Sequence, residues 1–334
     1  MSLGPAQLVF RSLLQRDLTR QVHQDPQHFA ALTQRHLLKE VYTCSMVTTQ
    51  MLTVRDTRLF ARIVGAADRP PLICLHGGPG LDHTEFADYL DPLSDTVRLV
   101  LIDQRAQGRS DRQAPQETWT LEQMAADVSA VAEAMGAEKY AVLGHSYGAF
   151  VALQHAVTYP DAAATIACCG VGSSRWLADV SAKLESFEPL DLREQVRRSW
   201  VDEVNVHTEA DFARLMHEQM PWHFSDPRDP RIAEFNARVD AMNPRYAPDV
   251  LRQFSAAGYG GIEVEDELGG VSQPLLVLSG RHDRTCPPEA GELIAARTPN
   301  AELHIFEESG HMPFVEQTQE FLAVTRAFLK RTLA

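Results

Sequence analysis

The segment Gly144-His145-Ser146-Tyr147-Gly148 has a serine two residues from a glycine on either side. It follows an apolar run over 140–143, which suits a strand, and precedes a helical pattern over 148–159. A serine on a sharp turn between strand and helix exposes its hydroxyl, and glycines leave room for that turn. We therefore predict that Ser146 is a nucleophile for acyl transfer.

A serine hydroxyl needs a base, and the base needs a group that orients it. His311 lies in a loop after the last predicted strand, and Asp283 follows the strand predicted over 275–278. Along the chain the three residues follow the order serine, acid, histidine, which is the order of α/β-hydrolase triads. Each lies beyond the carboxyl end of a predicted strand, where the sites of open parallel sheets lie. Asp266 and Glu267 are the weaker alternatives for the acid.

The segment His76-Gly77-Gly78-Pro79-Gly80 follows an apolar run over 71–75. Glycines allow backbone N–H groups to turn toward a developing negative charge. We expect the N–H groups of Gly78 and Tyr147 to form an oxyanion hole, and His76 to be structural.

Strands must alternate with helices to position these residues. Residues 51–55 and 59–64 read as a hairpin, and short continuous apolar runs typical of buried parallel strands follow at 71–75, 97–102, 140–143, 165–169, 275–278 and 302–306. Helical patterns lie between them at 121–135, 148–159, 288–296 and 318–329. The sequence therefore predicts an α/β fold with a doubly wound, mostly parallel sheet.

The alternation stops between 172 and 260, where helical patterns and scattered aromatic residues replace strands. A helical insertion beyond the ends of the strands is the expected form of a cap. We divide the chain into a helical extension (1–45), a first core part (46–171), the cap (172–260) and a second core part (261–334).

The composition narrows the class of protein. The chain has 334 residues, 31 Lys+Arg against 45 Asp+Glu, a net charge of −14, and 44% hydrophobic residues. The acidic excess argues against binding nucleic acid or an anionic membrane. No apolar run approaches the roughly 18 residues of a membrane helix. Five cysteines in so long a chain fit a reducing compartment, so we expect a cytoplasmic protein.

Patterns for cofactors are incomplete. His217-Glu218 lacks the second histidine of a zinc-protease motif, and Gly170-Val171-Gly172 lacks the third glycine of a dinucleotide loop. Cys168 and Cys169 lie in a predicted buried strand and are expected in the core. We predict no metal and no cofactor.

The glycine-rich segment 76–80, Asp103-Gln104-Arg105 with Gly108-Arg109-Ser110, and the serine turn together resemble the proline iminopeptidase family of α/β-hydrolases. The resemblance covers about residues 50–334. It implies an α/β-hydrolase fold with a helical cap and a cofactor-free aminopeptidase that releases N-terminal proline from short peptides. It also implies Ser146, Asp283 and His311 as the catalytic triad.

Some positions depart from the family. Ala106 stands where the family usually has glycine, and His145 and Tyr147 flank the serine as in general esterases. The family binds the substrate's amine through cap carboxylates. Asp240 is our best candidate, with Glu203 and Glu234 behind it, and Gly77 is also expected to contact substrate.

Two other functions stay open. An esterase or lactonase could use the same triad, and a requirement for a free amine discriminates it from an aminopeptidase. The second alternative is a binding protein on an inactive hydrolase fold. The intact predicted triad argues against it. The sequence gives no oligomeric state.

Overall fold

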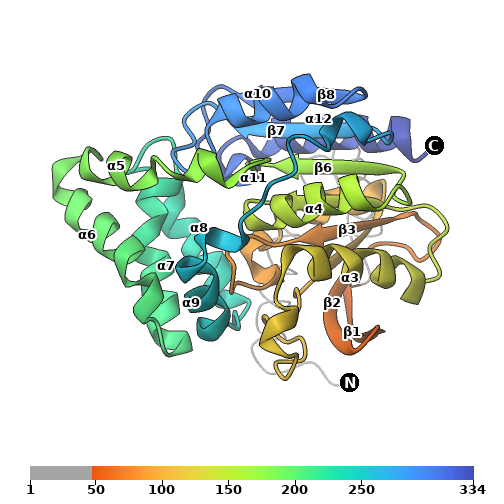
Figure 1. Ribbon diagram of the computed structural model, residues 1–334, viewed down its shortest axis with the longest axis horizontal. Helices are drawn as coiled ribbons and strands as arrows, with labels where there is room; N and C mark the ends of the chain where they lie inside the picture. Colours follow the sequence, from red (N-terminus) through yellow and green to blue (C-terminus); the bar gives the residue numbers. More distant parts are fainter. Residues whose placement is uncertain (1–46) are drawn as a thin grey trace, which may run out of the picture. The chain divides into compact units, whose positions relative to one another are not determined.

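The computed structural model describes residues 47–334, so the predictions made for 1–45 lie outside the described residues. One sheet has the strand order β1-β2-β4-β3-β5-β6-β7-β8 (Figure 1). β2 is antiparallel to β1 and β4, and all other pairs are parallel. The strands are β1 (Val47–Val54), β2 (Thr57–Val64), β3 (Pro71–Leu75), β4 (Arg98–Ile102), β5 (Ala141–His145), β6 (Ala164–Cys168), β7 (Leu275–Gly280) and β8 (Ala301–Phe306).

The central strands form because their side chains are apolar on both faces. Every residue of β3, β5, β6 and β7 is buried. Alternate residues of β3 enter different clusters: Ile73 and Leu75 pack into one core, Leu72 and Cys74 into the other. A sheet buried on both sides needs no polar alternation, which is why these strands read as continuous apolar runs.

Helices cover both faces of the sheet. α3 (Leu121–Ala134), α4 (Tyr147–Thr158) and α10 (Pro288–Arg297) contribute to the core that holds Ile73. α12 (Thr318–Thr332) and the short α11 (Pro313–Glu316) pack in the opposite core. The predicted α/β-hydrolase fold with a mostly parallel sheet is confirmed.

Five helices interrupt the alternation between β6 and β7: α5 (Val180–Glu185), α6 (Leu190–Val201), α7 (Glu209–His223), α8 (Arg231–Ala241) and α9 (Pro248–Ala256). Figure 1 shows them grouped beside one end of the sheet. The chain enters and leaves this insertion at one place, since Ser173 bridges to Glu263 and the N–H of Val264 donates to the carbonyl of Gly172 at 2.8 Å. This insertion is the predicted helical cap; its domain boundaries stay a prediction.

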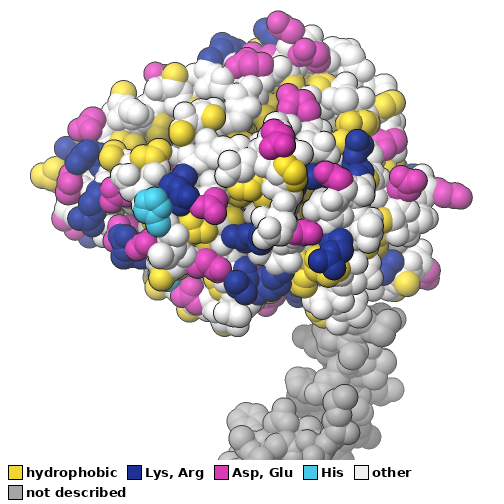
Figure 2. Space-filling view, turned by 60° about the horizontal axis from the view of Figure 1, so that its bottom comes forward, with side chains coloured by type: hydrophobic (Ala, Val, Ile, Leu, Met, Phe, Trp, Pro, Cys, Tyr) yellow, Lys and Arg dark blue, Asp and Glu magenta, His cyan; other side chains and the backbone are white. Residues whose placement is uncertain are grey.

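The described surface mixes charges of both signs. On the face shown in Figure 2, acidic and basic side chains are interspersed. Within residues 47–334, no helix is both long and apolar enough to cross a membrane.

We expect a chain that lacks residues 1–40 to fold and to keep its hydrolytic activity, because the sheet begins at Val47 and both cores are built from residues after it. Circular dichroism and turnover of a small ester measure this. A folded truncation without turnover would show that the first 40 residues belong to the active site.

Candidate active site

The turn at Ser146 is strained. β5 ends at His145 and α4 begins at Tyr147, so Ser146 alone makes the reversal, with φ 52° and ψ −119°. This region is costly for a residue with a Cβ and persists only where the surrounding structure enforces it. A Cβ at Gly144 would lie 2.0 Å from the carbonyl oxygen of Gly148, and one at Gly148 would lie 2.2 Å from that of Leu75. The two glycines are therefore sterically required.

The structure brings His311 and Asp283 together. Nδ1 of His311 lies 2.6 Å from Oδ2 of Asp283, and both side chains are buried. The other carboxylate oxygen of Asp283 accepts N–H bonds from Thr285 and Cys286 at 2.8 and 2.9 Å, which fixes its orientation. Because the carboxylate accepts, Nδ1 carries a proton and Nε2 is left as the basic nitrogen.

The alternative acids lie elsewhere. Asp266 is almost fully exposed, with 97% of its side chain accessible, and pairs with Arg297. Glu267 is exposed as well. The geometry therefore favours Asp283 as the partner of His311.

Ser146 and His311 line one cavity of about 350 Å³. Gly78 and Tyr147 lie in its wall, and helices of the cap supply most of the rest. The cap side is mainly apolar, with Leu184, Trp200, Phe212, Met216, Met220, Phe235, Val239 and Leu251. The cavity therefore joins the serine, the histidine and the predicted oxyanion donors in a mostly apolar space.

The peptide between Gly77 and Gly78 has a fixed orientation. Its carbonyl oxygen lies 2.8 Å from Nδ1 of His76. The carbonyl and the N–H of a trans peptide point in opposite directions, so the N–H of Gly78 points away from His76. Gly78 has φ +108°, a conformation that favours glycine. The N–H of Tyr147, the second predicted donor, lies in the first turn of α4, where N–H groups lack partners within the helix.

The segment Asp103-Gln104-Arg105 contacts the glycine-rich loop 76–80 through His76. We call this loop the oxyanion loop, after the predicted role of Gly78. The N–H of Gln104 donates to Nε2 of His76 at 3.1 Å, so the ring proton lies on Nδ1, the nitrogen that donates to Gly77. The side-chain amide of Gln104 donates to the carbonyl of His76 at 2.8 Å. Arg105 anchors the segment through Asp127 and Asp56. His76 is fully buried, has protein partners at both ring nitrogens and is not part of the cavity wall, which fits the structural role predicted for it.

Sequence reasoning missed Glu85, which lies in the short 3-10 helix His83–Phe86 and lines the cavity. Its carboxylate is buried and accepts the N–H of Gly77 at 2.5 Å. This N–H is therefore unavailable to a substrate, and Gly77 does not appear in the cavity wall, contrary to the contact expected from the sequence. No motif marks Glu85, because its partner His145 is 60 residues away in the sequence.

His223 is the second residue that the sequence did not single out. It ends α7, lines the cavity, and its ring centroid lies 5.1 Å from that of His311. Burial and the nearby His311 hold its pKa well below the usual range, so the ring is neutral. Its carbonyl accepts the N–H of His311 at 2.6 Å, so the cap contacts the histidine loop directly.

Among the described residues, three carboxylates line the cavity: Asp82, Glu85 and Glu203. Asp82 pairs with Arg109 at 2.7 Å, and Glu85 lies 3.0 Å from Nδ1 of His145. Glu203 has only neutral partners, namely Gln219, Ser255 and Tyr259. Burial raises the pKa of Glu203, and these hydrogen bonds offset part of that rise. Glu203 is thus the cavity carboxylate whose charge is not balanced.

The structure does not bring the other predicted cap acids to the cavity. Asp240 has half of its side chain exposed and pairs with His217 at 3.3 Å. Glu234 pairs with Arg238 on the outer face of α8. Neither acid lies in the cavity wall.

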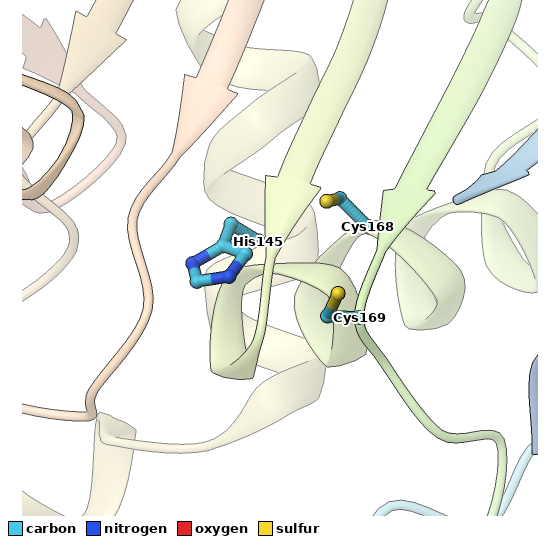
Figure 3. A group of neighbouring side chains, drawn as sticks. All are labelled: His145, Cys168 and Cys169. Carbon is cyan, nitrogen blue, oxygen red and sulfur yellow. The ribbon is translucent and has the colours of Figure 1, made fainter. Parts of the chain in front are cut away.

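Three groups within residues 47–334 are close enough to hold a metal ion. In the first, shown in Figure 3, His145 lies beside Cys168 and Cys169, but Glu85 and the carbonyl of His311 occupy both ring nitrogens. The second group consists of Cys169, Asp283 and His311. Its aspartate and histidine are hydrogen-bonded to each other, and Asp283 also accepts two backbone N–H bonds. The third, Asp82, His83 and Asp103, is likewise committed to protein hydrogen bonds. The absence of a metal stays a prediction.

The doubly covered parallel sheet, the serine on a strained turn and the paired histidine and aspartate are the features of one large class of enzymes. The profile described as the alpha/beta hydrolase fold matches residues 70–318, and the chain belongs to this family. It is a hydrolase of that family and is similar to proline iminopeptidases.

Relatives with known names support this similarity. The proline iminopeptidase of Heyndrickxia coagulans is 27% identical over 274 residues, which cover 78% of this chain and 90% of the relative. The crystal structure of the Mycobacterium smegmatis proline iminopeptidase is 25% identical in sequence and matches with a TM-score of 0.67. The match covers 85% of this chain and 98% of the M. smegmatis chain. A proline iminopeptidase-related protein of Thermus thermophilus is 26% identical with a TM-score of 0.68, over 86% and 98% of the two chains.

Replacing Gly148 by alanine is expected to destabilise the protein by about 1–3 kcal/mol, because the new methyl group would overlap the carbonyl of Leu75. Urea unfolding measures the change. The control is Gly270→Ala, where a Cβ meets no atom within 4 Å and the φ angle is ordinary. Equal stability of both variants would contradict the steric account of the turn.

Proposed function

We propose that the protein is a serine aminopeptidase that releases proline or a similar residue from the free N-terminus of a short peptide. One observation carries this proposal: Ser146, His311 and the unbalanced carboxylate of Glu203 line the same cavity. The core supplies groups for acyl transfer, and the cap supplies a negative charge for the substrate's ammonium.

In the proposed mechanism, His311 takes the proton from the hydroxyl of Ser146 as the serine oxygen attacks the carbonyl carbon of the substrate. The N–H groups of Gly78 and Tyr147 bind the oxyanion, and Asp283 stabilises the charged ring of His311. The ring then gives the proton to the leaving amine as the amide bond breaks. Water, activated by His311, hydrolyses the acyl-enzyme and restores the serine.

The charge of Glu203 supports the choice of a free amine. An ammonium group that enters a mainly apolar cavity loses hydration, and an opposite charge has to compensate for that loss. Asp82 and Glu85 already have cationic partners, so Glu203 is the remaining carboxylate in the wall. The names of the relatives agree with this substrate class, since the H. coagulans and M. smegmatis proteins are both proline iminopeptidases.

An esterase is the second candidate, and the apolar cap wall favours it. A cavity of about 350 Å³ lined by Leu184, Phe212, Met216 and Phe235 suits an apolar acyl or alcohol group. Such a substrate would not need the charge of Glu203.

We further propose that the protein works in the cytoplasm. The four described cysteines, Cys74, Cys168, Cys169 and Cys286, form no disulfide with one another, which fits a reducing compartment.

Ser146→Ala, Asp283→Asn and His311→Ala are each expected to lower kcat by about 10⁴-fold or more, with non-additive effects because the three groups act as a unit. Steady-state kinetics on a chromogenic ester or aminoacyl anilide measure this, and EDTA should leave the parent's rate unchanged. Full activity of Ser146→Ala would exclude the mechanism, and failure of the parent to react with a fluorophosphonate would favour a binding protein.

Glu203→Gln is expected to raise KM for prolyl p-nitroanilide by about 10- to 100-fold, since an ion pair with the substrate is lost. KM for p-nitrophenyl acetate should change little, and the parent should not cleave the N-acetylated prolyl substrate. Glu234→Gln is the matched control, because this exposed cap acid and its partner Arg238 both lie outside the cavity wall. Equal cleavage of free and acetylated substrates would favour the esterase.

The raised pKa of Glu203 predicts a pH dependence of amine binding. Below this raised pKa the carboxyl is protonated and does not attract the ammonium, so KM for the prolyl substrate should fall as pH rises through it. KM for p-nitrophenyl acetate serves as the reference at each pH. The same pH dependence in Glu203→Gln would show that another group causes it.

A further inference from the structure

A single buried carboxylate connects the oxyanion loop to the residue before the nucleophile. One oxygen of Glu85 accepts the N–H of Gly77 at 2.5 Å, and the other lies 3.0 Å from Nδ1 of His145. A Cβ at Gly77 would lie 2.6 Å from Glu85 Oε1 and 3.1 Å from Cβ of Ser146, so both side chains border the space beside Gly77.

The ring of His145 continues this connection to the histidine loop. Its Nε2 lies 2.8 Å from the carbonyl oxygen of His311. The ring centroid lies 4.9 Å from that of His311 and 5.0 Å from that of Phe314, so the ring is packed as well as hydrogen-bonded. In Figure 3 the ring lies at the end of β5, near Cys168 and Cys169 at the end of β6.

The partners determine the protonation of His145. A carbonyl oxygen and a carboxylate both accept, so both ring nitrogens donate and the ring is an imidazolium. Burial disfavours charge on either group, but the opposite charge and the hydrogen bonds outweigh it. They raise the pKa of His145 to about 10 and lower the pKa of Glu85. The pair is therefore ionised around neutral pH, and its net charge is zero.

We propose that Glu85 and His145 are positioning residues, which hold the oxyanion loop, the Ser146 turn and the His311 loop in the arrangement that the reaction needs. This inference rests on the proposed role of Ser146. The pair touches each of the three segments and leaves no net charge for the transition state. Its contribution is therefore geometric.

If the role of Glu85 is geometric, two of its substitutions should differ in their effects. In Glu85→Gln the amide oxygen accepts the N–H of Gly77, and the amide nitrogen donates to Nδ1 of a neutral His145, whose Nε2 still donates to His311. The whole network persists without charge. Glu85→Leu has a similar volume and retains none of these hydrogen bonds.

The experiment measures the rate at which a fluorophosphonate labels Ser146 in the full chain, per folded molecule. Glu85→Leu is expected to label about 10²-fold more slowly than the parent, because small misplacements of reacting groups have effects of this size. Glu85→Gln should recover most of the rate, and kcat on an ester should follow the labelling rate with KM nearly constant. The control, His155→Gln, replaces a buried histidine further along α4 and should label like the parent.

Two results would overturn the inference. The first is that folded Glu85→Leu is labelled as fast as the parent. The second is that Glu85→Gln is labelled as slowly as Glu85→Leu, which would indicate that the charge of Glu85 matters and not its geometry. If Glu85→Leu does not fold, His145→Asn takes its place, because an asparagine is too short to reach both Glu85 and His311. Failure of the proposed function looks different, since the parent itself would then not be labelled.

Discussion

The close approach of the serine turn to its neighbouring strands is the constraint on which the active site depends. The N–H of Ser146 donates to the carbonyl of Cys168 at 2.9 Å, and the backbone of Gly148 packs against that of Leu75. These contacts hold the serine in a conformation that an isolated chain would avoid. They also place the first N–H groups of α4 beside the oxyanion loop that follows β3. A looser turn would separate Ser146 from the N–H groups that we propose bind the oxyanion of the tetrahedral intermediate.

The sequence predicts the elements of the core well because each depends on local patterns. Continuous apolar runs identified the buried strands, and the structure differs at their ends by only a residue or a few; β5, predicted over 140–143, spans Ala141–His145. The cap is harder. α8 buries Phe235 and Val239, and Asp240 follows Val239 by one residue, about 100° around the helix, so it faces outward. Glu203 lies in a short 3-10 helix with no periodic pattern, so its burial was not visible in the sequence.

The connections within the site escape sequence reasoning for a related reason. Gly77, Glu85, His145 and His311 are spread over more than two hundred positions, and the hydrogen bonds that join them exist only after the sheet has formed. A motif search finds the glycines and the serine because their constraints are local. The histidine before the serine resembled an esterase feature in the sequence. In the structure it is half of a buried ion pair.

The carboxylates that the core and the cap contribute to the site differ in whether an opposite charge balances them. Around the serine, each acid of the core is paired: Asp283 with His311, Glu85 with His145 and Asp82 with Arg109. A paired acid holds its partner in position, and because the two charges cancel, it leaves little electrostatic field to attract a charged substrate. The unbalanced charge of Glu203 comes from the cap and is surrounded by neutral donors. A change at Glu203 can therefore alter which substrates bind while the acyl-transfer groups keep their positions, because Glu203 shares no hydrogen-bond partner with Asp283, Glu85 or Asp82 among the described residues.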